Sequence, residues 1–153
     1  MAHYKTTVAS PVPAAEVFGY LADFSTAAEW DPGVSSSELI DGQPGHTGAR
    51  YLVTASFLGF PIPLEYQILE SVEPTDSTFS GRVVLEAGNA NFRSFDVITV
   101  SPTSTGCSVT YDADLALKGF RRPFDPALRL AFKVIGDRAR AGLTAAVQTR
   151  PVS

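Results

Sequence analysis

The sequence is poor in the residues that build metal and redox centres. It holds one cysteine, Cys107, and two histidines, His3 and His46, in 153 residues. A single cysteine excludes an internal disulfide and any zinc knuckle based on cysteine pairs. The sequence has no G-x-S-x-G or C-x-x-C motif, and its glycine-rich stretch 42–48 lacks the lysine of a phosphate-binding loop. We therefore expect neither a bound metal nor a cofactor.

Positive charge and long apolar runs are also scarce. Lys and Arg number 12 against 16 Asp and Glu, which gives a net charge of −4 and argues against a nucleic-acid partner. No run is long enough to cross a membrane, so we expect no integral membrane association. Residues 1–10 lack the apolar core of a signal peptide, and we expect a cytoplasmic protein. The length and the 44% hydrophobic content predict one folded domain, 1–153, of undetermined oligomeric state.

The chain begins with a strand and two short helices and then becomes almost entirely strand. Pro11 and Pro13 separate the strand from the first helix, and Asp31-Pro32-Gly33 ends the second. A weak strand and a glycine-rich loop follow, and the strand pattern starts again at Arg50. The predicted ranges are a strand at 2–10, helices at 14–22 and 23–30, a strand at 35–40 and a loop at 41–48.

A long amphipathic helix is predicted near the C-terminus, in the stretch from Phe124 to Val147. Asp125 can cap the helix, and Pro126 suits its first position. The apolar positions recur every three or four residues, so this helix needs a broad apolar surface to lie on. They are Leu128, Ala131, Phe132, Ile135, Ala139, Gly142, Leu143 and Ala146.

Four turn signals divide the strand-rich half into hairpins, at 58–61, 73–76, 86–89 and 102–105. Counting outward from each turn predicts the cross-strand partners. All four registers place the same mostly apolar set on one face. The sequence therefore predicts an α+β fold with an antiparallel meander, one face of which is dry. The predicted pairs include Val53 with Tyr66, Ile68 with Val83, Val83 with Phe92, and Ile98 with Val109.

Three stretches resemble a known superfamily: 10–24 running on to Glu29-Trp30-Asp31-Pro32, then 45–51, and 109–119. They are similar to the START and birch-pollen-allergen-like (SRPBCC) superfamily, and most of all to its polyketide cyclase/dehydrase-like branch. The resemblance implies a helix-grip fold, in which a curved antiparallel sheet wraps around the long C-terminal helix. It also implies a hydrophobic cavity between helix and sheet. Members include cyclases and carriers of lipids and quinones, so the likeness leaves the function open.

Asp96 and Tyr111 are the candidate catalytic residues. The fourth hairpin sets them opposite each other on the inner face, with Cβ atoms about 5 Å apart. A carboxylate desolvated there would have a raised pKa and could act as a general acid or base. The alternatives are a structural hydrogen bond or a bulge that turns Asp96 toward water. Glu70 falls on the same face near a turn, where we expect it to be solvated.

The candidate ligand-binding residues share the inner face of the sheet or the apolar face of the last helix. The phenols of Tyr51 and Tyr66 could hydrogen-bond a ligand's carbonyl or hydroxyl group, although ordinary core roles are equally possible. Gly81, predicted opposite Ser94, would widen the interior or admit a bend in the sheet, because it has no side chain. The candidates are Tyr51, Val53, Tyr66, Ile68, Phe79, Gly81, Phe92, Ser94, Ala113, Phe132 and Ile135.

Three functions remain possible on the sequence alone. The first is binding or transport of a small hydrophobic molecule, such as a lipid, a polyketide or a quinone-like compound. The second is a cyclase or dehydratase that uses Asp96 and the tyrosines, and the third is an interaction protein without a ligand. A cavity lined by carbon favours the first, converging polar groups around a shifted carboxylate favour the second, and a sealed core favours the third.

Overall fold

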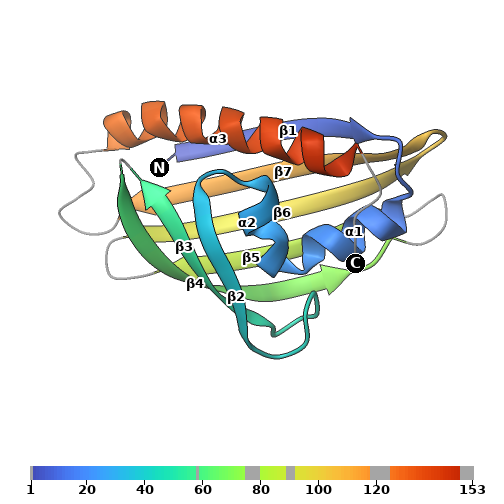
Figure 1. Ribbon diagram of the computed structural model, residues 1–153, viewed down its shortest axis with the longest axis horizontal. Coiled ribbons are helices and arrows are strands. Elements are labelled where there is room, and N and C mark those ends of the chain that lie inside the picture. The colour runs from blue at the N-terminus through green and yellow to red at the C-terminus, as the bar shows by residue number, and fades with distance from the viewer. Residues whose placement is uncertain (1, 58, 75–79, 89–91, 118–124, 149–153) are drawn as a thin grey trace.

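A computed structural model describes residues 2–57, 59–74, 80–88, 92–117 and 125–148, with the side chains of 2, 57, 117, 125–132 and 135 excepted. Seven antiparallel strands form one open sheet in the order β1-β7-β6-β5-β4-β3-β2. The predicted α+β helix-grip fold is confirmed (Figure 1). The strands are β1 (Ala2–Ser10), β2 (Val34–Asp41), β3 (Arg50–Phe57), β4 (Phe60–Val72), β5 (Gly81–Gly88), β6 (Phe92–Thr103) and β7 (Gly106–Leu117).

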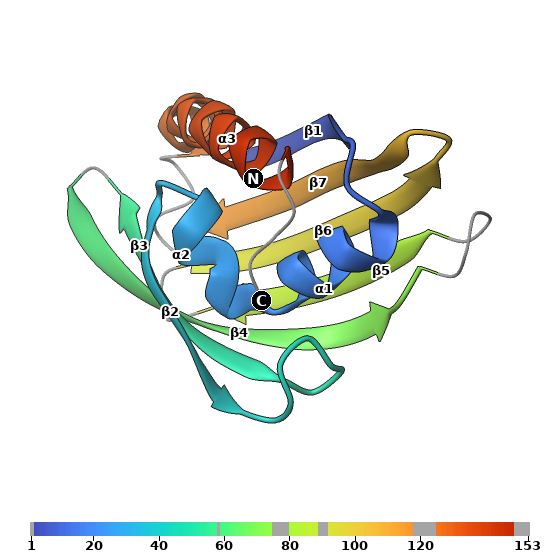
Figure 2. The same cartoon turned by 45° about the vertical axis from the view of Figure 1, so that its right-hand side comes forward.

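The helices lie on the concave side of the sheet, at different ends (Figure 2). Helix α1 lies over β5 and β6, while α3 runs alongside β1. None of the described helices is long and apolar enough to cross a membrane. The helical segments are α1 (Ala14–Ala22), a 3₁₀ turn η1 (Phe24–Thr26), α2 (Ala27–Trp30) and α3 (Asp125–Val147).

Helix α3 buries the face that the sequence predicts, as far as its side chains are described. Ala139 and Leu143 are buried, whereas Lys133 and Arg140 on the opposite face are exposed. Two glycines allow close contact with the rest of the fold. A Cβ at Gly136 would overlap the ring of Tyr4, and one at Gly142 would overlap the carbonyl oxygen of Trp30. The helix therefore rests directly on β1 and α2.

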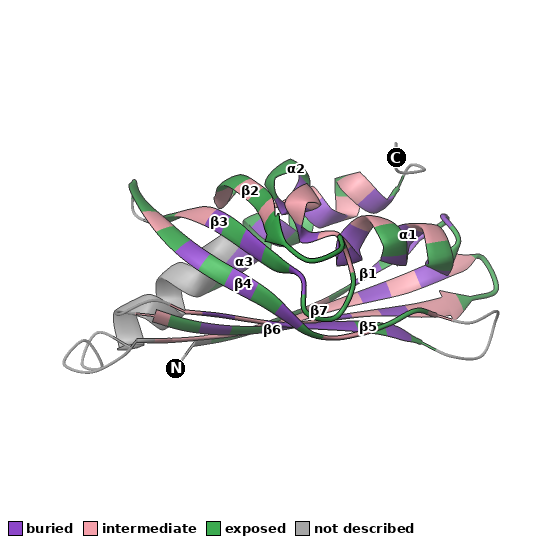
Figure 3. Ribbon diagram, turned by 90° about the horizontal axis from the view of Figure 1, so that it is seen from below, coloured by how far each residue is buried: buried purple, intermediate pink, exposed green. Residues whose placement is uncertain are grey.

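The inner face of the sheet is largely as predicted, but the predicted strand registers are wrong. Val53 pairs with Leu64, Val83 with Ile98, and Ile98 with Tyr111, so the partners differ from the expected ones by two, six and two residues. Even displacements leave every side chain on its original face, because side chains alternate with a period of two. Figure 3 shows buried and exposed positions alternating along β4.

Turn length explains part of the displacement. The turns at 58–61 and 102–105 were expected to span four residues, but Phe57 pairs with Phe60 and Thr103 with Gly106. Each hairpin is therefore closed by two residues. In the first, Gly59 has φ of 82°, a conformation that two-residue turns need and that glycine adopts readily. Because each turn is shorter than expected by two residues, the register shifts by two and every side chain keeps its face.

A bulge in β4 has a further effect on Glu70. Ile68 pairs with Leu85, two residues from the expected partner, and the register shifts again between Ile68 and Glu70. Beyond this bulge the carboxylate of Glu70 lies 2.7 Å from the guanidinium of Arg82, with both side chains about half exposed. The expectation that Glu70 is solvated is confirmed.

Candidate functional site

A partly enclosed pocket of about 110 Å³ lies on the inner face of the sheet. Its walls are mostly apolar, and they come from η1, the segment after α2, and strands β2, β3, β4, β6 and β7. No described residue of α3 lines it, so the described lining belongs to the sheet and the short helices rather than to the long helix. The lining residues are Phe24, Asp31, Gly33, Val34, Val53, Ala55, Ser56, Ile62, Leu64, Tyr66, Phe92, Ser94, Asp96, Tyr111, Ala113 and Leu115.

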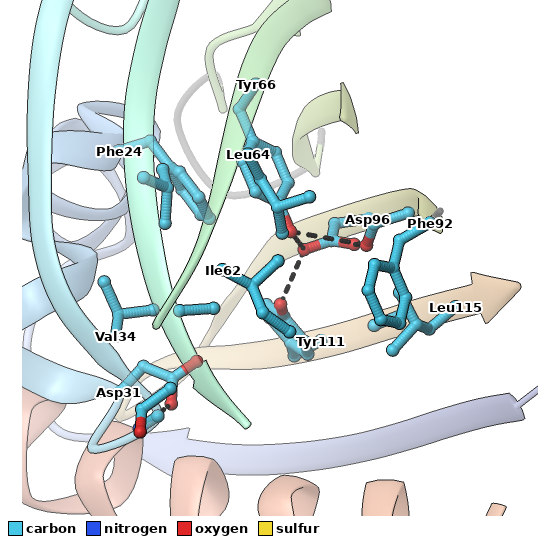
Figure 4. A pocket seen from close by; sticks show the side chains of 16 residues that line it. Phe24, Asp31, Val34, Ile62, Leu64, Tyr66, Phe92, Asp96, Tyr111 and Leu115 are labelled. Atoms are coloured by element: carbon cyan, nitrogen blue, oxygen red, sulfur yellow. Dashed lines mark hydrogen bonds between the residues drawn. The ribbon is translucent and has the colours of Figure 1, made fainter. Parts of the chain in front are cut away.

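Asp96 is the centre of a buried polar cluster on one wall of this pocket. Its side chain accepts a hydrogen bond from Tyr111 Oη at 2.7 Å and one from Ser94 Oγ at 2.8 Å. Tyr66 Oη lies 3.5 Å from the carboxylate and 3.3 Å from Ser94 Oγ. Figure 4 shows the side chains of Tyr66 and Tyr111 pointing toward Asp96 from two sides. The cluster therefore joins β4, β6 and β7 through one acidic group.

The Asp96–Tyr111 contact was predicted, but it arises from a different register. Asp96 pairs with Ala113, while Tyr111 pairs with Ile98, so the hydrogen bond runs diagonally across the strand pair. A tyrosine can make such a contact, because its side chain spans the distance between diagonal neighbours. The even displacement of the register preserved the face and hence the contact.

Burial changes the acid–base properties of the cluster. It raises the pKa of Asp96 to about 6, against the hydrogen bonds from Tyr111, Ser94 and Tyr66, which lower it. The same burial, together with the charge of Asp96, holds the pKa of Tyr66 and of Tyr111 well above the usual value. Asp96 is therefore the group in this cluster that titrates closest to neutral pH.

Asp31 is a second carboxylate in the pocket, and the sequence reasoning missed it. It follows α2, in the turn that ends the helix, and its Oδ1 accepts the backbone N–H of Gly33 at 2.8 Å. Burial raises the pKa of Asp31 to about 6, and its charge contributes to the raised pKa of Asp96. The Asp31-Pro32-Gly33 sequence signalled only a turn, because nothing in its spacing shows that the turn faces a pocket.

The structure brings five of the candidate ligand-binding residues together with the two candidate catalytic ones. All seven line the same pocket, from strands β3, β4, β6 and β7. Leu64 on β4 also lines it, although the sequence did not propose this residue. The five candidates in the lining are Val53, Tyr66, Phe92, Ser94 and Ala113.

Other candidate ligand-binding residues lie away from the pocket. Tyr51 and Ile68 are outside its lining, with side chains buried in the core. The hydroxyl of Tyr51 donates to Asp23 at 3.2 Å and accepts from the N–H of Gly45 at 3.0 Å, so it serves a structural role. Phe79 and the side chains of Phe132 and Ile135 lie outside the described residues.

Gly81 faces inward as predicted, but it does not widen the interior. It pairs with Val100 rather than with Ser94. A Cβ at Gly81 would overlap Cδ of Pro74 and would lie 2.8 Å from Cδ2 of Phe18. The missing side chain therefore gives room to α1 and to Pro74, just after β4, and this part of the inner face is filled.

A second hollow in the described surface lies outside this pocket. It measures about 430 Å³ and contains Arg50 and Arg93, which pair with Glu65 and Glu86. These four side chains neutralise one another and are partly exposed. They therefore leave little unpaired charge for a ligand.

The described residues also include one group that could hold a metal ion. The ligand atoms of His3, Asp112 and Asp114 lie within 4.8 Å of one another. Asp112 and Asp114 alternate with Tyr111 and Ala113 along β7, so they point to the opposite face of the sheet. The group therefore takes no part in the chemistry of the pocket.

Comparison with known proteins agrees with this fold. Residues 1–148 match the family described as "Polyketide cyclase / dehydrase and lipid transport". No curated protein matches the chain significantly. A START superfamily protein from Mycobacterium smegmatis is 12% identical, with a TM-score of 0.73 over 96% of this chain and 97% of that one.

Two further solved structures are similar over most of their length. The Zhui aromatase/cyclase from a Streptomyces species is 12% identical, with a TM-score of 0.69 over 95% of this chain and 90% of that one. A protein from Thermus thermophilus is 15% identical, with a TM-score of 0.71 over 95% of each chain. At these identities the likeness shows the fold alone. With the family match over nearly the whole chain, the protein belongs to the polyketide cyclase/dehydrase and lipid transport family of the SRPBCC superfamily.

Proposed function

We propose that this protein binds a small, mainly apolar molecule in the pocket beside Asp96. The observation that carries the proposal is the composition of the pocket: apolar walls surround one compact polar cluster. Ligand sites commonly have this form, because apolar walls supply affinity and a few placed polar groups fix the orientation. The pocket also weakens the hypothesis of a ligand-free interaction protein, which a sealed core would have favoured.

The size of the pocket limits what it can hold. Its volume of about 110 Å³ is well below the ~300–1,000 Å³ of sites for drug-sized ligands. It is closer to the ~150 Å³ cavity that accepts a benzene molecule. A single ring or a short chain fits this space, and a larger lipid, polyketide or quinone-like compound would place only one such part in it.

Acid–base catalysis of the cyclase or dehydratase type is the second candidate. Converging hydroxyls and a raised pKa at Asp96 are the features that favour an enzyme. We prefer the binding function to catalysis because both carboxylate oxygens of Asp96 already accept hydrogen bonds and the residue is only 1% exposed. These hydrogen bonds also lower the pKa of Asp96, which makes the carboxylate a weaker base.

Fluorobenzene, observed by ¹⁹F NMR, tests the binding function with a probe that donates no hydrogen bond. Ala113→Trp should abolish binding because it fills the pocket. Ala116→Trp is the matched control, since it lies on the same strand but points to the other face. Asp96→Asn should leave the binding largely intact, because the probe has no donor for the carboxylate. Absence of binding to the parent protein would refute the proposal.

The same Asp96→Asn variant separates the two candidate functions once a substrate is known. General acid–base catalysis typically contributes about 100-fold or more to the rate. A loss of that size in kcat for Asp96→Asn, with unchanged substrate binding, would identify Asp96 as the general acid or base. Unchanged turnover would mean that Asp96 takes no part in the reaction.

A further inference from the structure

The hydroxyl protons around Asp96 are all directed within the cluster. Each hydroxyl has one proton to donate. Tyr111 and Ser94 donate theirs to the carboxylate, and the proton of Tyr66 points to Ser94 or Asp96. At pH 8 the carboxylate is mostly ionised, because its pKa is about 6. The lone pairs that remain on these oxygens can only accept hydrogen bonds from a ligand.

Asp31 adds a second acceptor to the same pocket. The N–H of Gly33 is the only donor to its carboxylate among the described residues. The charge of Asp31 also contributes to the raised pKa of Asp96, Tyr66 and Tyr111, so all four groups lie in one electrostatic field. No lysine, arginine or histidine is among the described residues that line the pocket.

We propose that the pocket selects ligands that carry a hydrogen-bond donor, an ammonium or a hydroxyl group, on a small apolar body, and that it rejects carboxylates. This inference rests on the binding function proposed above and specifies its ligand. A donor group satisfies the acceptors of the cluster, and an ammonium also pairs with the carboxylates. A ligand carboxylate would meet two like charges away from bulk water, which is strongly unfavourable.

Four probes with one ring and different substituents test the selectivity at pH 8 and constant ionic strength. They are toluene, benzyl alcohol, benzylamine and benzoate, titrated against the amide resonances of Leu64 and Ala113. Benzylamine, an ammonium ion at this pH, should bind at least about 10-fold more tightly than benzoate. Benzyl alcohol should fall between them.

The variants Asp31→Asn and Asp112→Asn separate a local effect from the net charge of the protein. Both remove one negative charge, but Asp112 points to the other face of the sheet. Asp31→Asn should reduce the ratio of the benzoate and benzylamine dissociation constants at least about 3-fold, and Asp112→Asn should change this ratio by less than about 2-fold. Equal narrowing by both variants would overturn the proposal, because it would assign the preference to overall charge.

The probes also distinguish the two proposals from each other. Failure of all four probes, toluene included, would refute the binding function itself. Binding of toluene together with benzoate at least as tight as benzylamine would overturn only the donor preference. This comparison uses the parent protein, so it holds even if a variant does not fold.

Discussion

The two ends of the concave face differ in how the space above the sheet is filled. At the α1 end, Phe18 lies against Gly81, and Ile68 and Val83 are fully buried. At the other end, the wall around Asp96 borders a pocket. The sheet supplies apolar side chains at both ends, so the difference lies in what covers it. Helix α1 covers the sheet at the filled end, whereas η1 and the segment after α2 border the pocket.

Truncating one aromatic side chain in the filled end should have the largest effect. Phe18→Ala should lower the free energy of unfolding by about 3–5 kcal/mol, because it opens a cavity in a packed core. Ile62→Ala should cost only about 1 kcal/mol, because Ile62 is partly exposed and already borders the pocket. Urea denaturation measures both values, and equal losses would contradict the difference between the two ends.

The free energy of unfolding should also depend on pH, because Asp96 borders the pocket and has a raised pKa. Burial raises the pKa of Asp96 from 3.8 in the unfolded chain to about 6 in the folded one. The folded state then binds the proton more tightly, so this contribution to stability is complete below about pH 4 and is lost as pH rises through about 6. The loss is on the order of 3 kcal/mol.

Asp96→Asn tests the assignment of this pH dependence. Urea denaturation of parent and variant between about pH 4 and pH 8 should show a smaller fall in stability for the variant. Glu38→Gln, at an exposed position on β2, should keep the parent's dependence. If Asp96→Asn shows the same fall in stability as the parent, then titration of Asp96 does not cause the pH dependence.

Two glycine substitutions should change stability in opposite directions. Gly81→Ala should cost about 1–3 kcal/mol, because its Cβ would overlap Pro74 and Phe18. Gly19→Ala, on the exposed side of α1 with nothing within 4 Å, should stabilise the protein by up to about 1 kcal/mol. Thermal denaturation measures both changes. A Gly81→Ala variant as stable as the parent would mean that this end is not filled.

The alternation of apolar residues was enough to predict the inner face, the order of elements and the Asp96–Tyr111 contact. It could not predict turn lengths, so the pairings of Val53, Val83 and Ile98 were wrong while their faces were right. Gly81 was misread because a missing side chain is compatible both with a cavity and with a close contact. Only the tertiary structure shows that α1 covers Gly81.

Asp31 was missed for a related reason. An aspartate before Pro-Gly is common in turns, and its hydrogen bond to Gly33 is of that ordinary kind. Its place in the pocket depends on how α2 packs against β2 and α3, which no local spacing reveals. Pocket-lining residues on a turn are therefore harder to predict than those on a strand.

Mapping the binding of toluene by methyl NMR tests the position of the pocket most directly. Resonances of Leu64, Ala113 and Leu115, which line the pocket, should shift on titration. Those of Val17 and Val83, which are fully buried at the α1 end, should not. Shifts at Val17 and Val83 without shifts at Leu64 and Ala113 would contradict the assignment of the pocket to the Asp96 end.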